Sequence, residues 1–490
     1  MNKKMVSAML GVGMVMSMLT GGSISAAAAN DGDVETITIY TPFVGNNDDQ
    51  QLVVDAINEI ASEEIGVEIN WQQFNIGQWF QQYSLFLSGT DEIDILFNFG
   101  GISNGVGQGA FMELDDLVEE YGQGIAEILG DYLVCGEVNG QLYGLIPYNL
   151  YASYYGIAYR ADIVSELGLE EEVAAVETLS DWGAILEAVK EAYPGITPYV
   201  TGTGTSMSNF YYGDWDSLSD SMGVLMNCGE STEVVDLFET DEYAELCSVM
   251  SDWYDAGLTS KDIQTVTDSY STLCAQGVAF STVTSMDATT AYDMTNSTGY
   301  EIKTIQLGES FASTYTDGLY AIMANSEHAE AAMKFLNLMY TDSRILNLMS
   351  YGIEGIHYQV LEDGTLDYLD GQDSSSCTYH DELGACANMA LRSEWQGDYP
   401  NLGELIEEDN ATCKKSAALG FVFDSTPVVN QTTEVDNVLT KYRIGIESGS
   451  MNAEETLPVF IEELKTAGID EVIAEKQSQL DEWLSGNQSE

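Results

Sequence analysis

The side chains that could carry chemistry in this chain of 490 residues are acids and aromatic rings, not nucleophiles or metal ligands. The sequence has 80 Asp and Glu, 28 Tyr and 7 Trp, but only three His. It contains no GxxxxGKS/T phosphate-binding loop and no HExxH zinc motif. Two carboxylates suited to glycoside hydrolysis could be chosen among 80 acids in many ways, so their number is no evidence for that reaction. We expect no catalytic residue, no bound metal and no cofactor.

Two glycine-containing patterns could still hold side chains towards a ligand. The stretch 105–110 matches part of a dinucleotide fingerprint, but its glycines lie well past the end of the preceding strand instead of in a tight strand-to-helix turn. We expect a loop at the mouth of a cleft there. Glu354 lies between Gly352 and Gly355, which permit a turn that presents its carboxylate to a cleft. A hinge residue that contacts only backbone is the alternative.

Sugar recognition fits the composition better, because sugars are bound by aromatic faces and by planar polar side chains that bond pairs of hydroxyl groups. Such residues occur after predicted strands, or in polar and loop-like segments where two lobes would face each other. With Glu354, the candidate ligand-binding residues are Phe43, Asn46, Asn98, Asn149, Tyr151, Tyr212, Asp214, Trp215 and Trp395. For each aromatic residue the alternative is a place in the hydrophobic core.

The elements that would position these residues alternate between strands and helices. In chain order the apolar patterns are a strand at Ile37–Tyr40, a helix at Leu52–Ala61, a strand at Val67–Trp71, a helix at Gln78–Leu87, a strand at Ile93–Phe97 and helices at Leu114–Tyr121 and Ile125–Leu133. Such alternation predicts an α/β fold in which helices cover both faces of a sheet.

The remainder of the chain predicts a second unit and a helical C-terminus. The extended segment Pro147–Tyr155 leads from the first α/β unit into the second, and the middle of the chain, 211–300, is rich in helical patterns. Near the end, Gly468 terminates one amphipathic helix, and the apolar positions of 469–483 give the next helix a buried face. We expect these helices to form a cap on the second lobe.

The charge of the chain excludes some partners and permits a large core. With 80 acids against 15 Lys and Arg, the net charge is −65, spread along the sequence, so nucleic acid and anionic lipid surfaces are repelled. Hydrophobic residues still make up 45% of the chain, which is enough for a sizeable core. A solvated surface explains the acidity, and adaptation to high salt is the alternative.

Seven cysteines cannot all pair with one another. Cys135, Cys228, Cys247 and Cys274 lie in apolar or helical contexts, so we expect them in the core. Cys377 and Cys386 bracket a short polar loop and are candidates for a disulfide. A zinc site of these two cysteines with His380 is the weaker alternative, because the CxxC pairs typical of such sites are absent.

The N-terminus predicts export. Lys3 and Lys4, the apolar run Met5–Leu19 and the small residues up to Ala29 form the pattern of a secretory signal peptide over residues 1–29. A transmembrane helix is the alternative, but the run is short and interrupted by glycine.

The order of these pieces resembles family 1 extracellular solute-binding proteins of ABC importers. The resemblance rests on the strand that ends at Phe97, on Asn139–Gly144, on Tyr155–Asp162 and on the helical segment after Gly318. The C-terminal block at 457–484 resembles a subgroup that carries an extra helical domain of undefined name and serves oligosaccharide-type importers. In lipidated members a cysteine stands where this chain has Gly22, so no lipid anchor is expected at that position.

The resemblance implies two α/β lobes of the periplasmic-binding-protein type II architecture, with a helix-rich second lobe. Lobe 1 is expected to comprise 30–150 and about 305–360. Lobe 2 is expected to comprise 151–304 and about 361–490, with the helical cap from about 420.

The implied function is that of an exported receptor, outside the cell or on the outer face of its membrane, that delivers a neutral oligosaccharide to an ABC permease by closing its two lobes. We expect a monomer and no nucleic acid partner. A receptor of the same fold for a peptide or a cationic solute stays open. So do a carbohydrate-active enzyme and a surface protein that adheres to glycans.

Overall fold

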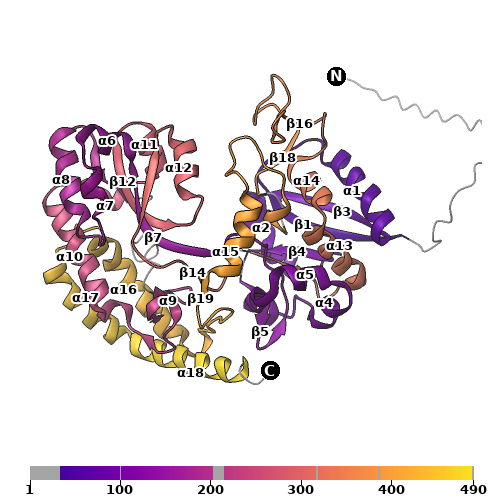
Figure 1. The fold of residues 1–490 in the computed structure, drawn as a ribbon. Helices are drawn as coiled ribbons and strands as arrows, with labels where there is room; N and C mark the ends of the chain where they lie inside the picture. Colours follow the sequence, from indigo (N-terminus) through magenta and orange to yellow (C-terminus); the bar gives the residue numbers. More distant parts are fainter. Residues whose placement is uncertain (1–33, 100, 202–214, 316–317, 384–386, 488–490) are drawn as a thin grey trace, which may run out of the picture.

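The computed structural model describes residues 34–99, 101–201, 215–315, 318–383 and 387–487, so the predicted signal peptide lies outside the described residues. These residues form two lobes, each built on its own hydrophobic core (Figure 1). Both lobes combine a mixed sheet with helices, which confirms the α/β fold class. Among the described residues, no helix has the length and apolar character needed to cross a membrane.

Lobe 1 is built on a four-stranded sheet in the order β15-β4-β1-β3. Strand β1 pairs in parallel with β3 and β4, and β15 pairs with β4 in the antiparallel direction. The strands are β1 (Glu35–Phe43), β3 (Val67–Asn75), β4 (Ile95–Asn98) and β15 (Leu319–Ile322), and the helices are α1 (Gln50–Ile65), α2 (Ile76–Leu87), α4 (Asp115–Tyr121), α5 (Gln123–Leu129), α13 (Ala329–Thr341) and α14 (Ser343–Tyr351).

The sequence patterns of lobe 1 produce these elements for ordinary physical reasons. Ile37 and Ile39 alternate along β1 and are fully buried, as expected of a strand with one face in the core. Helix α1 ends at Gly66, whose left-handed conformation (φ 70°) favours glycine. The glycine-rich stretch 105–110 differs from expectation, because it begins inside a short helix, α3 (Ile102–Gly107), instead of a loop. Gly105 lies so close to the ring of Phe111 that a Cβ atom would overlap it.

Lobe 2 is built on a six-stranded sheet in which β7 is the central member. The order is β19-β14-β7-β12-β8, with β13 also paired to β7. The strands are β7 (Ala152–Arg160), β8 (Thr197–Tyr199), β12 (Ala279–Met286), β13 (Ile302–Gln306), β14 (Phe311–Ala312) and β19 (Lys414–Lys415). Around them lie α6 (Ala161–Leu167), α7 (Glu170–Ala174), α8 (Trp182–Ala192), α10 (Asp241–Asp255), α11 (Tyr270–Ala275) and α12 (Thr290–Thr298). Trp182 stacks on Phe280 at 5.7 Å inside this core.

A small three-stranded sheet connects lobe 2 to the C-terminal helices. It has the order β11-β10-β9, and its strands are β9 (Trp215–Asp216), β10 (Val224–Leu225) and β11 (Val234–Val235), with α9 (Met226–Gly229) beside them. The C-terminal helices are α16 (Val429–Glu447), α17 (Ala453–Ala467) and α18 (Ile469–Asn487). As predicted, Gly468 ends α17 and Val472 and Leu480 of α18 are fully buried. These helices run along the lower side of lobe 2 in Figure 1 and share its core, so they are an integral part of it.

The lobe boundaries differ from those expected. Residues 361–413 do not return to lobe 2, because β18 (Tyr379–Asp381) pairs with β2 (Gly45–Asn47) of lobe 1, and Tyr379 and Ile406 lie in the lobe 1 core. This added part also contains β16 (Tyr358–Val360), β17 (Leu366–Tyr368) and α15 (Leu402–Thr412). The chain passes back to lobe 1 only between β14 and β15, and it reaches lobe 2 for the last time at β19.

We predict that Phe460→Ala lowers the stability of lobe 2, although residue 460 belongs to the C-terminal helix α17. Its side chain is fully buried, with ring centroids 5.2 Å from Phe238 and 5.6 Å from Tyr442. The cavity left by alanine should lower the free energy of unfolding by about 3–5 kcal/mol. Differential scanning calorimetry measures this, with Val459→Ala as the matched control, because Val459 is 50% exposed. Equal, small effects of both changes would contradict a shared core.

Candidate functional site

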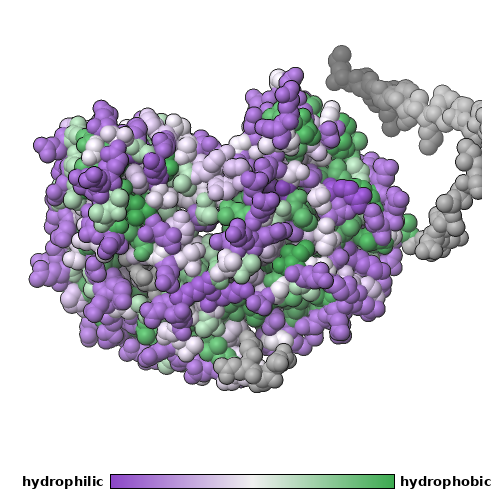
Figure 2. All heavy atoms as spheres, viewed as in Figure 1, coloured by the Kyte–Doolittle hydropathy of each residue, from purple (hydrophilic) through white to green (hydrophobic). Residues whose placement is uncertain are grey.

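A cavity of about 490 Å³ lies where the two lobes meet. Its wall comes from four segments that are distant in sequence, namely 150–153, 216–219, 285–290 and 311–315, together with Phe421. The space-filling view shows that the molecule is hollowed between the upper parts of the two lobes (Figure 2). The named wall residues are Leu150, Tyr151, Ala152, Ser153, Asp216, Ser217, Leu218, Ser219, Ser285, Met286, Asp287, Thr290, Phe311, Ser313, Thr314, Tyr315 and Phe421.

Backbone crossings between the lobes form part of this wall. Strand β7 leaves lobe 1 next to Tyr151, and its first residues pair with β14, where Phe311 lies opposite Ser153. Strand β14 also pairs in parallel with β19, where Phe311 lies opposite Lys414. The three crossings therefore form one small ladder of hydrogen-bonded strands. Ligand sites of two-lobed α/β proteins are expected at such a junction.

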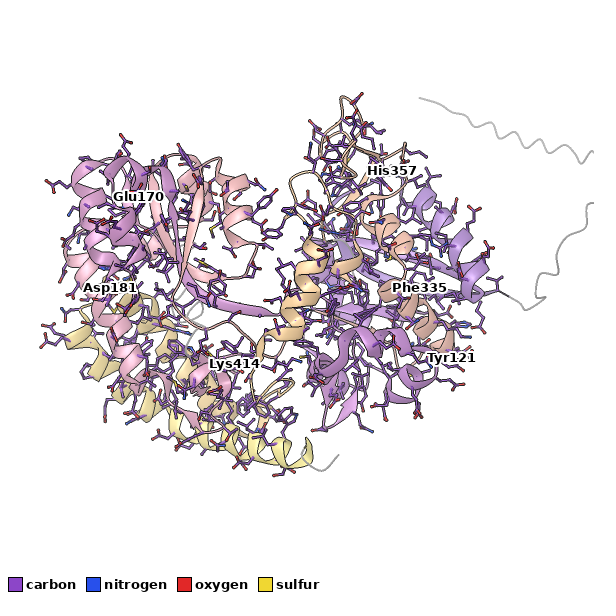
Figure 3. All side chains as sticks on the ribbon, in the orientation of Figure 1. Tyr121, Glu170, Asp181, Phe335, His357 and Lys414 are labelled. Carbon is purple, nitrogen blue, oxygen red and sulfur yellow. The ribbon has the colours of Figure 1, made fainter. Side chains whose placement is uncertain are left out.

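Two adjacent lysines on β19 bond to opposite lobes. Successive side chains of a strand point in opposite directions. The Nζ atom of Lys414 lies 3.0 Å from Glu230 and 2.9 Å from Glu309, on the lobe 2 side, and Figure 3 shows Lys414 between the two lobes. The Nζ atom of Lys415 lies 2.9 Å from Asp131 of lobe 1. All three acids are largely exposed, so these ion pairs are weak enough to rearrange when the lobes move.

Asp216 is a buried carboxylate in the cavity wall. It is 4% exposed at the end of β9, and its Oδ1 accepts a hydrogen bond from the Leu218 amide at 3.1 Å. Its Oδ2 has no well-formed hydrogen bond among the described residues, although the side chain of Ser416 lies close enough to lower the pKa of this carboxyl. Burial raises the pKa of Asp216, and hydrogen bonding and the charge of Lys476 offset this only in part. A buried oxygen of this kind is expected to find a donor, and because it is closed to solvent, a ligand hydroxyl would reach it only after a local rearrangement of the wall.

Asp287 places a second carboxylate in the wall, directly after β12. Its Oδ1 accepts three hydrogen bonds, from the Thr289 amide at 2.9 Å, the Thr289 hydroxyl at 2.8 Å and the Thr290 hydroxyl at 3.0 Å. These bonds fix the carboxylate at the strand end beside the start of α12. Such a fixed acceptor can orient a ligand hydroxyl without a further change of rotamer.

The two lobes also touch above the cavity, and acids face each other there. Tyr292 of α12 makes an edge contact with Tyr399 of lobe 1, with ring centroids 5.5 Å apart. Burial raises the pKa of Asp293, and the charges of Asp287 and Asp398 raise it further. Carboxylates of both lobes thus repel one another at this edge.

A comparison with protein families identifies the fold. A model described as "Bacterial extracellular solute-binding protein" matches residues 48–343, which is more than half of the chain. The chain belongs to this family of bacterial extracellular solute-binding proteins. A second model, described as "Domain of unknown function (DUF3502)", matches residues 417–485. The predicted subgroup is therefore confirmed, and family membership also confirms that the chain is a binding protein and not an enzyme.

Two relatives and several solved structures are similar to this solute-binding protein. A Streptococcus pneumoniae protein named "Carbohydrate ABC transporter substrate-binding protein" is 26% identical over 95% of this chain and 94% of its own length. The "Polygalacturonan/rhamnogalacturonan-binding protein YtcQ" of Bacillus subtilis is 23% identical over 64% of this chain and 61% of its own length.

The crystal structure of the N-glycan transport solute binding protein (NgtS) of S. pneumoniae shares the fold. It is 22% identical to this chain, covers 92% of it and 100% of NgtS, and gives a TM-score of 0.80. Two complexes of NgtS, with Man1GlcNAc and with Man5GlcNAc, give TM-scores of 0.69 and 0.65.

Some of the predicted ligand residues lie at the junction of the lobes. Tyr151 lines the cavity, is 9% exposed, and donates its hydroxyl hydrogen to the Pro147 carbonyl at 2.8 Å. Asn149 lies two residues before it, and its carbonyl accepts a hydrogen bond from Asn410 at 2.7 Å. Asn410 in turn accepts a hydrogen bond from the Tyr151 amide at 3.2 Å. These hydrogen bonds attach the start of the first crossing between the lobes, at Asn149 and Tyr151, to helix α15 of this solute-binding protein.

Other predicted residues of lobe 1 do not line the described cavity. Phe43 ends β1 and is partly buried, and Asn98 ends β4 with 1% exposure. The side-chain amide of Asn46 donates to the Ser374 carbonyl at 2.7 Å, so it holds a loop of lobe 1. Glu354 is exposed in a turn between glycines with positive φ, as expected, but the turn lies beside Tyr358. These four residues are not among the named residues of the cavity wall, so their role in ligand binding stays a prediction.

Trp215 lies in the core of lobe 2 instead of facing a ligand. Its side chain is fully buried and belongs to the same cluster as Met222 and Val224. Trp215 therefore occupies a place in the hydrophobic core, which was the alternative given for each aromatic residue. The adjacent Asp216 is the residue that lines the cavity. Tyr212 and Asp214 lie outside the described residues.

Trp395 belongs to an aromatic cluster in the added part of lobe 1. Its ring centroid lies 5.0 Å from that of Tyr351, 4.9 Å from that of Tyr368 and 4.6 Å from that of His380. This aromatic cluster is not part of the described cavity wall. Burial, and then the charge of Arg392, lowers the pKa of His380 to about 4.

The cysteines are placed largely as expected. Cys135, Cys228, Cys247 and Cys274 are all buried, which confirms the prediction of core positions. Cys386, the predicted partner of Cys377, lies outside the described residues. Within the described ranges, no three His, Cys, Asp or Glu side chains are grouped so as to hold a metal ion.

The cavity contains residues that the sequence analysis did not select. Asp287 directly follows the apolar strand Ala279–Met286, so the same strand-end rule that selected Asn98 applied to it. Asp216 gave no such signal, because β9 has only two residues. Phe421 lies near the start of the region matched by the DUF3502 model, residues 417–485, and it reaches the wall by tertiary packing alone.

We predict that His380 makes stability depend on pH in the acidic range. Because the pKa is about 4 in the folded state and about 6.5 in the unfolded chain, the unfolded state binds the proton first. The stabilisation is complete above pH 6.5 and is lost as the pH falls towards 4, by about 3 kcal/mol. Chemical denaturation of the wild type and of His380→Phe at several pH values measures it. The difference between the two should widen in favour of the wild type as pH rises, whereas parallel profiles would contradict the buried state of His380.

Proposed function

We propose that this protein is the receptor of an ABC importer for a neutral oligosaccharide and that it acts by closing its lobes around the ligand. The observation that carries the proposal is the chemistry of the interlobe cavity. Its named wall combines aromatic rings, hydroxyl groups and two aspartates, and none of its named members is Lys, Arg or His. Two similar proteins, a carbohydrate ABC transporter substrate-binding protein and the N-glycan transport protein NgtS, are named for carbohydrates, which supports the sugar assignment.

The wall offers both kinds of contact that a sugar needs. Tyr151, Tyr315, Phe311 and Phe421 supply apolar faces for C–H surfaces. Asp216 and Asp287 supply acceptors for sugar hydroxyls, and the serine and threonine hydroxyls both donate and accept. The volume of about 490 Å³ lies within the range of small-molecule sites.

The charge of the wall favours a neutral ligand over an anionic one. A uronate carboxylate would meet Asp216 and Asp287 at short range in a partly desolvated site, where like charges repel strongly. The net charge of −65 adds a repulsive long-range field. A polygalacturonan ligand, as named for YtcQ, is therefore disfavoured here. A cationic solute or a basic peptide remains the second candidate, because the same two aspartates would attract it.

Closure follows from the separate cores and the narrow junction. Because short strand crossings join two lobes with separate cores, a ligand that contacts both lobes shifts the equilibrium towards the closed state. The permease of the importer would recognise the closed state, and the exported receptor would act as a monomer.

The proposal predicts saturable one-to-one binding of a neutral oligosaccharide by the mature protein. Isothermal titration calorimetry tests it with a panel that contains Man1GlcNAc, Man5GlcNAc and other neutral glycans, an oligogalacturonate, and a basic peptide. The ligand should be recovered unchanged. Binding of the basic peptide alone would favour the second candidate, binding of the oligogalacturonate alone would contradict the charge argument, and a consumed sugar would indicate an enzyme.

The variant Asp216→Asn extends this test to the cavity itself. It keeps the shape of the side chain but replaces a carboxylate acceptor, so affinity for the best sugar of the panel should fall by about tenfold, since a hydrogen bond to a charged group contributes about 1.5–3 kcal/mol. Asp236→Asn is the matched control, because Asp236 also has a buried Oδ2 without a described donor but does not line the cavity. Unchanged affinity of Asp216→Asn would place the ligand elsewhere.

A further inference from the structure

The cavity segment 216–223 has an unusual backbone for its sequence. Leu218, Ser219 and Ser221 have positive φ values of 48°, 78° and 63°. Side chains with a Cβ rarely adopt this region, and such conformations persist only where the surrounding structure holds them. Because residues 216–219 line the cavity, whatever holds this segment also determines the shape of the ligand site.

A buried ion pair from the C-terminal block holds the segment. Lys476 of α18 is 0% exposed, and its Nζ lies 2.5 Å from Oδ1 of Asp220 and 3.4 Å from the Gly223 carbonyl. The same Asp220 oxygen accepts the Met222 amide at 2.8 Å, so one carboxylate joins the turn to the helix. An ammonium that is fully removed from water requires such a partner.

Close packing surrounds the segment next to the pair. A Cβ atom on Gly223, whose φ is 104°, would lie 2.7 Å from Val234 and 3.1 Å from Ile473 of α18. Leu218 shares a small core with Phe421 and Leu480. The C-terminal block thus contacts the segment on the side away from the ligand, while Phe421 itself lines the cavity.

We propose that Lys476 is a positioning residue of the ligand site, and that the C-terminal region matched by the DUF3502 model, residues 417–485, serves to hold the turn that presents Asp216, Ser217 and Ser219 to the cavity. The role in ligand affinity rests on the proposed function. The role in holding the turn does not, because it concerns the free protein.

The first test is hydrogen–deuterium exchange of the free full-length chain with Lys476→Met. Amides of 216–223 should exchange faster than in the wild type, whereas those of β1 and β4 in lobe 1 should not change. Lys465→Met is the matched control, because the Nζ of Lys465 lies 2.6 Å from Glu239 in a pair that is partly exposed on both sides. Wild-type exchange of 216–223 in Lys476→Met would overturn the proposal, whether or not a sugar ligand is found.

The second test separates positioning from the burial of a charge. Lys476→Met should weaken binding of the best sugar of the panel by about tenfold if only a tenth of the molecules keep the turn. The double variant Lys476→Met/Asp220→Asn removes the unpaired carboxylate and should regain much of the lost melting temperature, but not the affinity. A double variant with wild-type affinity would overturn the proposal, and so would a Lys476→Met protein that loses melting temperature alone. If Lys476→Met does not fold, Asp220→Ala, which removes the oxygen that accepts from both Lys476 and the Met222 amide, replaces it as the single variant in both tests with the same expected results.

Discussion

The structure depends on one constraint, which is that the chain of the two lobes crosses between them through a small ladder of paired strands. Strands β7, β14 and β19 lie side by side at the junction, and each core is complete on its own side of it. Because the described residues form separate main clusters for the two lobes, the relative position of the lobes is set by the ladder, by a few surface contacts and by whatever occupies the cavity. A receptor whose conformation depends on whether a ligand is bound requires a junction of this kind.

The scarce cations of this acidic chain are concentrated where the fold needs them. Among 15 Lys and Arg, Lys414 and Lys415 bond to opposite lobes from one strand, and Lys476 is buried against Asp220. The exposed pairs contribute little to stability, about 0–1 kcal/mol each, so they do not oppose motion. Removing the partner of a buried charge is costly, so the pair of the fully buried Lys476 with the one-third exposed Asp220 resists rearrangement more than the exposed pairs do. The cavity segment 216–223 is therefore held by a strong interaction, whereas the ion pairs of Lys414 and Lys415 at the lobe junction are weak.

Much of the fold could be predicted because its signals are local. The strand and helix patterns of lobe 1 have regular apolar periods, and Gly66 and Gly468 end helices through backbone conformations that glycine favours. The placement of 361–413 could not be predicted in the same way. Its decisive contact pairs Tyr379 with Asn47, more than three hundred residues away in sequence, through three-residue strands that carry no periodic signal.

The candidate site was predicted only where the resemblance and local chemistry agreed. Tyr151 and Asn149 lie at a crossing that the extended segment Pro147–Tyr155 made visible in the sequence. Trp215 looked polar and loop-like by its neighbours, yet it is a core residue, because β9 alternates and turns Asp216 to the opposite side. Asp216 acquires its role from the turn at 218–223, whose conformation depends on a helix near the C-terminus.

Small-angle X-ray scattering of the mature protein, with and without a saturating neutral oligosaccharide, tests the central claim most directly. The account predicts that the radius of gyration falls on binding and that the scattering curve changes from that of the open two-lobed arrangement to that of a more compact one. A saturated protein whose radius of gyration is unchanged would contradict closure about the β7, β14 and β19 ladder.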